Sequence, residues 1–142
     1  MKKGIFIISL DTELAWGRIH HRKLEEYRDR FSLYRSGVNW LLEIFEKYNV
    51  QATWDVVGHL FLDSCKLNDK GRAHPELPRP NYDWAEGDWY KFDPCSSIED
   101  ASDFYGTDII DMILNSRVKH EIGSHSFGHI CFKDPGCTHE VA

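Results

Sequence analysis

The sequence predicts an α/β protein with parallel strands, on three observations. An apolar run near the N-terminus is typical of a strand buried on both faces. A stretch with apolar residues at helical spacing follows it, and a second run rich in β-branched residues comes next. Strand, helix and strand in this order form a βαβ unit, whose strands are parallel and whose crossover is almost always right-handed. The length of 142 residues predicts a single domain.

The first half of the chain contains three expected elements. A strand is expected over 3–10, because this segment is rich in isoleucine and is followed at once by charge. A helix is expected over 31–48, with Ser36 as the N-cap of a first turn that begins at Gly37. The β-branched and aromatic run over 50–58 predicts the second strand.

The second half begins with a long irregular segment. Residues 63–100 hold four of the five prolines and many aromatic side chains, which indicates a functional loop or a disordered insertion rather than a simple connector; the aromatic content favours the loop. Apolar spacing within 98–117 predicts a second helix that starts after Ser97 or Ser102. A short third strand is expected over 120–123.

Composition narrows the possible partners. The chain has 17 Lys and Arg against 23 Asp and Glu, a net charge of −6, and no dense basic cluster, so we expect no nucleic-acid partner. The sequence shows neither a membrane-spanning run nor a full signal peptide, which favours a cytoplasmic protein with no membrane partner. The four cysteines form no CxxC pair. Cys131 and Cys137 lie near two histidines, but the spacing matches no common zinc framework, so free thiols are expected.

Two sets of residues point to chemistry. Asp11 and Glu13 follow the first strand, and the carboxyl ends of parallel strands usually carry the active site; capping of the next turn is the alternative reading. His125 and His129 follow the third strand, and on one helical turn their imidazoles would share a face and could share a metal ion. Two imidazoles and one carboxylate form the ligand set of many catalytic metal sites.

Four segments then resemble one family. SLDTE, LLEIFEKYNV, QATWDVVG and HEIGSHSFGH are similar to the N-terminal half of the polysaccharide deacetylase family, carbohydrate esterase family 4. The resemblance covers 5–129 apart from 63–100. It implies a distorted (β/α) barrel, a divalent metal ion such as zinc, and hydrolytic removal of acetyl groups from an N-acetylated carbohydrate substrate.

The resemblance also assigns roles to residues. His125 and His129 match the two metal-binding histidines, and Asp11 matches the catalytic base. The family's second acidic position is Thr12 in this chain, so Glu13 is our choice of third metal ligand, with Asp11 as the alternative carboxylate. A bound metal ion would activate water while Asp11 accepts its proton. Metal affinity should fall below about pH 6.5, where histidines become protonated.

The family's later motifs lie beyond the histidine block, and the chain ends 13 residues after His129. We therefore expect a partial (β/α) barrel without its C-terminal part. It is either the front of a longer protein or a variant completed by self-association, and the isolated chain could be inactive. Two other functions stay open: a non-catalytic metal- or sugar-binding remnant that keeps Glu13, His125 and His129, and an amidase acting on a small cyclic amide.

Several other side chains have simpler interpretations. Trp54 is expected in the core. His59 either lines the mouth of the site or lies in a solvated loop. The aromatic side chains of 82–92 either pack locally or stack on sugar rings. His20 and His21 are expected on the surface.

Overall fold

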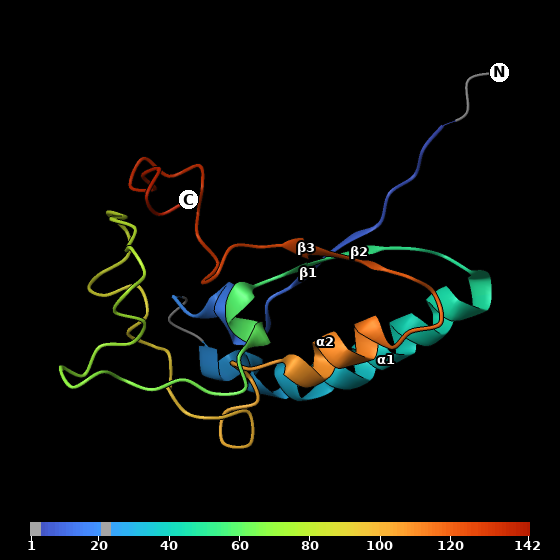
Figure 1. The fold of residues 1–142 in the computed structure, drawn as a ribbon, viewed down its shortest axis with the longest axis horizontal. Helices are drawn as coiled ribbons and strands as arrows, with labels where there is room; N and C mark the ends of the chain where they lie inside the picture. Colours follow the sequence, from blue (N-terminus) through green and yellow to red (C-terminus); the bar gives the residue numbers. More distant parts are fainter. Residues whose placement is uncertain (1–3, 21–23) are drawn as a thin grey trace.

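The computed structural model describes residues 4–20 and 24–142. It contains a parallel three-stranded sheet in the order β1 (Ser9–Thr12), β2 (Thr53–Val56) and β3 (Glu121–Ser124). Helices α1 (Arg28–Tyr48) and α2 (Thr107–Leu114) lie together on one side of this sheet (Figure 1). The predicted α/β class with parallel strands is confirmed. The sheet is open, and the described residues form no barrel.

The two faces of the sheet differ in chemistry. Leu10, Trp54 and Ile122 are neighbours in register and pack into the core, with Trp54 buried as predicted. The alternation of a strand places the intervening residues on the opposite face. That face is polar: it carries Ser9, Asp11, Thr53, Asp55, Glu121 and Gly123. The candidate site residues therefore lie at the carboxyl-end edge of this polar face.

The first strand is shorter than predicted. It begins at Ser9, and the apolar side chains of Ile5, Phe6 and Ile7 are exposed rather than buried on two faces; Lys3 lies outside the described residues. The reason is the length of its neighbour, because β2 offers ladder partners only from Thr53 onward.

Helix α1 starts earlier than the sequence predicts. Phe31 is buried in its first turns and anchors them, so Ser36 lies inside the helix and donates to the Leu33 carbonyl instead of capping the N-terminus. The end of α1 agrees with the prediction. Asn49 adopts the left-handed conformation with φ of 51°, and its N–H donates to the Glu46 carbonyl, which closes the helix.

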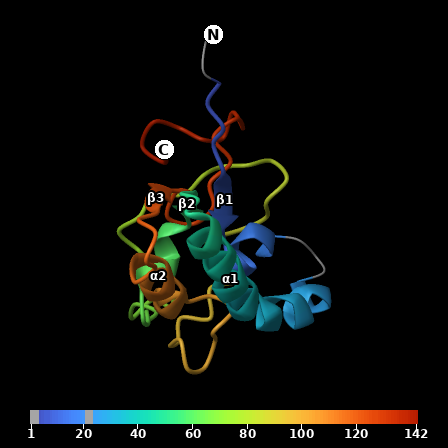
Figure 2. The same ribbon diagram turned by 90° about the vertical axis from the view of Figure 1, so that its right-hand side faces the viewer.

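Helix α2 packs beside α1 under the sheet (Figure 2). It begins after Gly106 rather than after Ser97 or Ser102. Arg35 of α1 fixes this start, because its guanidinium pairs with Asp108 at 2.6 Å and also donates to nearby backbone carbonyls. Neither helix is long and apolar enough to cross a membrane, nor is any other helix in the described part of the chain.

Residues 63–100 contain no helix or strand, but buried aromatic side chains hold them in place. Tyr82, Trp89 and Tyr90 are each no more than 4% exposed. In Figure 1 this segment, green to yellow, lies beyond the carboxyl ends of the strands. The segment therefore stands beside the region where the sequence predicts the site.

Candidate metal centres

Glu13 stands at the sharp turn between β1 and the 3-10 helix η1 (Leu14–Arg18). Leu14 takes a positive φ of 48°, which turns the chain away from the strand direction. Trp16 then anchors η1, because its ring is fully buried and its Nε1–H donates to the Phe104 carbonyl at 3.1 Å. The Glu13 carboxylate is thus held at the carboxyl end of the sheet.

His125 and His129 lie in the turn that follows β3, and the backbone there is not a helical turn. Ser126 and His129 both have positive φ, 58° and 56°, which an α-helix does not allow. The Ser126 hydroxyl accepts a hydrogen bond from the Ile130 N–H at 2.7 Å and ties the turn together. The imidazoles still converge, with ring centroids 5.2 Å apart.

The structure brings Glu13, His125 and His129 together. Glu13 Oε1 lies 3.0 Å from Nε2 of His125 and 2.9 Å from Nε2 of His129. The hydrogen bond from His129 is the main reason that the pKa of Glu13 lies below its usual value. The three side chains keep 27 to 36% of their surface exposed, so the group is open to solvent. Its nitrogen and oxygen donors could hold a metal ion.

Asp11 lies outside this group of three. It is exposed on the polar face of β1 and, with Glu13 and Tyr34, lines a cavity of about 210 Å³. The Tyr34 hydroxyl donates to the Asp11 carbonyl. Thr12 is completely buried on the opposite face, so the residue at the family's second acidic position points away from the site.

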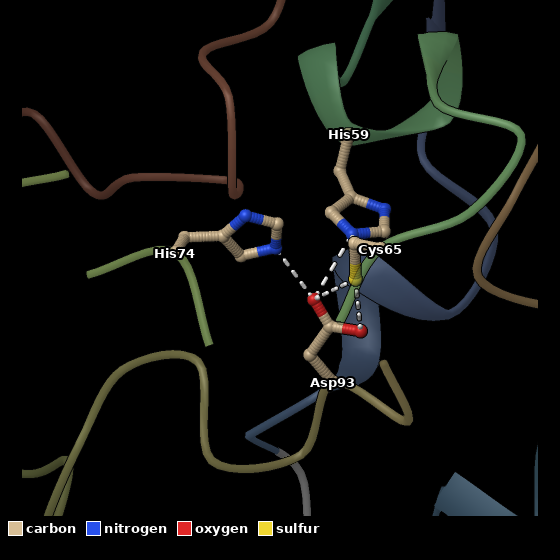
Figure 3. Close-up of side chains that lie close together, drawn as sticks. All are labelled: His59, Cys65, His74 and Asp93. Carbon is tan, nitrogen blue, oxygen red and sulfur yellow. Dashed lines mark hydrogen bonds and ion pairs between the residues drawn. The ribbon is translucent and has the colours of Figure 1, made fainter. Parts of the chain in front are cut away.

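A second group of possible ligands has no counterpart in the sequence prediction. Nε2 of His59, Sγ of Cys65, Nε2 of His74 and a carboxylate oxygen of Asp93 all lie within 4.8 Å of one another (Figure 3). Asp93 Oδ2 is 3.0 Å from His59 Nε2 and 2.8 Å from His74 Nε2. The side chains of His59 and Asp93 are 0% exposed, so both interpretations of His59 as a mouth or solvated residue are wrong.

No short-range spacing of ligands in the sequence predicts this second group. Its residues are separated by six, nine and nineteen positions, and only one of them is a cysteine. Zinc frameworks are recognised by close pairs of ligands, which are missing here. The density of His, Cys and Asp within 59–93 is the only hint that the sequence offers.

Aromatic side chains border the first group. Trp16, Trp84, Trp89 and His129 help to line a cavity of about 370 Å³. Trp89 packs locally and is buried, whereas Trp84 is 55% exposed and stacks on Tyr82. The segment 82–92 therefore combines local packing with an available aromatic surface. His20 is half-buried with its ring stacked on Trp89, and His21 lies outside the described residues.

Both donor sets fit metal binding by their chemistry. Two imidazoles with one carboxylate in an open position match catalytic zinc sites, which keep a place for water and substrate. Two imidazoles, a thiolate and a carboxylate in a buried position match a closed four-ligand site. In comparisons with known proteins, no family model matches the chain, and no solved structure matches it. The resemblance to polysaccharide deacetylases remains a prediction from motifs.

Proposed function

We propose that this chain is a metal-dependent hydrolase that removes acetyl groups from an N-acetylated carbohydrate. Glu13, His125 and His129 would hold the divalent ion, zinc. One observation carries the proposal: these three side chains, 112 and 116 residues apart, converge within hydrogen-bonding distance at the carboxyl ends of parallel strands. In open α/β sheets this edge is where ligands bind.

The exposure of the group favours catalysis over a structural role. A structural zinc ion is enclosed by four protein ligands, whereas three ligands leave a position for water or substrate. Glu13 is charged at neutral pH, because the imidazoles hold its pKa low, so it is ready to bind a cation. A zinc ion bound here would polarise the substrate's amide carbonyl and lower the pKa of a water molecule towards neutrality.

Asp11 is the general base in this proposal. It lines the same cavity as Glu13 but is not engaged by either histidine, so its carboxylate stays available for a proton. It accepts the proton of the attacking water and later returns it to the leaving amine.

The aromatic cavity supports a carbohydrate substrate. Sugar rings have flat apolar faces, and aromatic rings are suitable platforms for them. Trp84 offers such a surface beside His129, and the cavity of about 370 Å³ has the size of a small-ligand site. This observation favours a sugar over a small cyclic amide.

The architecture is compatible with part of a (β/α) barrel, and we include this in the proposal. All three strands are parallel, both helices cover the same face, and the other face is polar. In a barrel that polar face would line the interior at the active-site end.

The test is acetate release from N-acetylated oligosaccharides by the zinc-loaded chain, with small cyclic amides screened in parallel. Asp11→Asn should keep its metal and lose at least about 100-fold in rate, the size of a general-base contribution. The pair of substitutions His125→Ala and His129→Ala should lose one equivalent of metal, the one held by the Glu13 group, together with the activity. His139→Ala is the matched control, because His139 is exposed and belongs to neither group of ligands.

The outcomes separate the alternatives. Metal lost with the two histidines, together with acetate release, supports the proposal. Metal binding without hydrolysis of any acetylated sugar points to the non-catalytic remnant, and turnover of cyclic amides alone points to the amidase. Metal content that is unchanged in the double variant overturns the assignment of the ligands.

A further inference from the structure

We propose that His59, Cys65, His74 and Asp93 form a second, structural zinc site. This inference does not rest on the proposed function, because the four residues share no ligand with the Glu13 group. A zinc ion with bonds of about 2.0 to 2.3 Å requires donor-to-donor distances of about 3.3 to 3.8 Å. Cys65 Sγ lies 3.8 Å from His59 Nε2 and 3.5 Å from Asp93 Oδ2, within that range. Asp93 Oδ2 lies closer to the two imidazoles, 3.0 Å from His59 Nε2 and 2.8 Å from His74 Nε2, so its carboxylate would move by a few tenths of an ångström to admit the ion.

The hydrogen bond of His59 identifies which of its nitrogens faces the site. Nδ1 lies 3.1 Å from the Phe104 carbonyl, which can only accept, so Nδ1 carries a proton. In the neutral imidazole Nε2 then carries no proton and is an acceptor, and it lies 3.0 Å from a carboxylate oxygen of Asp93. Two acceptors repel each other at this distance unless a cation or a proton stands between them. A metal ion satisfies both.

Neighbouring groups also orient Asp93 and Cys65 through hydrogen bonds. The Cys95 N–H donates to Asp93 Oδ1 at 2.9 Å, which leaves Oδ2 for the site. The Tyr105 hydroxyl accepts from the Ser96 N–H, so its own proton is available to Cys65 Sγ at 3.3 Å. Outer-shell donors of this kind orient ligands in metal sites.

Charge also favours a zinc ion. A dication with one thiolate, one carboxylate and two neutral imidazoles is neutral, whereas unpaired charge is costly in a buried place.

The position of the cluster gives the ion its role. The backbone N–H of His59 donates to the Phe127 carbonyl at 2.9 Å, and the backbone N–H of Gly58 donates to the Ser126 carbonyl at 2.7 Å. The Phe127 ring lies against both His59 and His74. A zinc ion here fastens the segment 63–100 directly beneath the turn that carries His125 and His129.

Cobalt substitution of the 142-residue chain tests the site, because Cys65 is the only sulfur donor in either group. A chain carrying Glu13→Ala, His125→Ala and His129→Ala should still bind one Co²⁺ and show a thiolate-to-cobalt charge-transfer band. Cys65→Ser should lose this band. Cys131→Ser is the matched control and should retain it, because Cys131 is exposed and outside the cluster.

Three results would overturn the proposal: no band in the wild type at saturating Co²⁺, no metal in the triple variant, or an unchanged band in Cys65→Ser. If Cys65→Ser fails to fold, a chain in which Cys95, Cys131 and Cys137 are all replaced by serine decides. Retention of the band there supports Cys65 as the ligand, and its loss contradicts it. The proposed function is tested separately: it fails if the wild type binds one metal ion at the Cys65 group and none at Glu13, His125 and His129.

Discussion

The carboxylate of Glu13 occupies the space that a Cβ atom would take on Gly17. A methyl group built on Gly17 would clash with Oε2 of Glu13 and approach its carboxyl carbon to 2.8 Å. Glycine at this position therefore allows the carboxylate to fold back over η1 towards the two histidines. Gly17 has no side chain to contact a metal ligand, yet its lack of a Cβ atom determines where the Glu13 carboxylate lies.

Gly17→Ala should weaken metal binding at the Glu13 group. The methyl group displaces the carboxylate of a direct ligand, which should cost at least the roughly 10- to 100-fold in affinity that is lost when a group that orients a ligand is removed. Zinc competition with a chelator measures the effect, in a Cys65→Ser background so that one site is observed. Gly37→Ala is the control. Gly37 lies in α1 with open space around it, so this substitution should leave affinity unchanged and raise stability by about 0.5–1 kcal/mol. Equal affinities in the two variants would refute the prediction.

Asp93 should make the metal-free protein sensitive to acid. Burial raises the pKa of Asp93, but hydrogen bonds from His59 and His74 outweigh burial and hold it well below the usual 3.8. Because the folded pKa is the lower one, this stabilisation is fully present above about pH 4 and is lost as the pH falls through the folded value.

Asp93→Asn should therefore lower the free energy of unfolding at pH 7 by about 3–5 kcal/mol, as when one partner of a buried ion pair is removed. The difference between variant and wild type should narrow as the pH falls below 4. Urea unfolding in the presence of a chelator measures both. Asp69→Asn, at an exposed position, should change little at any pH. A difference for Asp93→Asn that is constant with pH would contradict the linkage.

Trp84 should contribute to substrate binding without affecting the metal. Trp84→Ala removes a half-exposed platform beside His129, and loss of one stacking interaction of about 0.5–1.5 kcal/mol corresponds to about a 2- to 10-fold rise in KM. Zinc content should be unchanged. Trp40→Ala is the matched control, because Trp40 is 62% exposed on α1 and does not line this cavity. Similar KM values in the two variants would remove Trp84 from the sugar site.

Elements with a clear local pattern were predictable from the sequence. The apolar spacing that ends at Tyr48 located the end of α1, and the β-branched run over 50–58 located β2. The short third strand expected over 120–123 lies within one residue of β3. The start of α1 was not predictable in this way, because burial of Phe31 against the core extends the helix through charged residues. Tertiary contacts decided that boundary.

The candidate site residues show the same difference between positions marked by a local sequence pattern and positions set by tertiary contacts. Asp11, Glu13, His125 and His129 could be proposed because they follow predicted strands, and the ends of parallel strands meet at one edge. The choice of Glu13 over Asp11 as the third ligand came from the resemblance to polysaccharide deacetylases. The ligands of the second cluster follow no such rule. His59 lies in the 3-10 helix η3 (Gly58–Phe61), and the other three come from loops whose course depends on buried contacts. One such contact is the Arg79 side chain, which donates to the carbonyls of Ala73, His74 and Leu77.

Trp89 joins the irregular segment to the histidine turn, and this link can be tested without removing any ligand. Its Nε1–H donates to the buried carbonyl of Gly128 at 2.8 Å, one residue before His129. Trp89→Phe keeps an aromatic ring but leaves that carbonyl without its donor, which costs about 1–3 kcal/mol in the free energy of unfolding. Trp84→Phe is the control, because the Trp84 Nε1–H bonds to Asp134 at an exposed position and should contribute far less. Zinc affinity of the Glu13 group should fall in Trp89→Phe alone, since the freed turn no longer holds His129 in place. Loss of stability with unchanged affinity would limit Trp89 to packing, and equal stability of the two variants would show that the hydrogen bond does not anchor the turn.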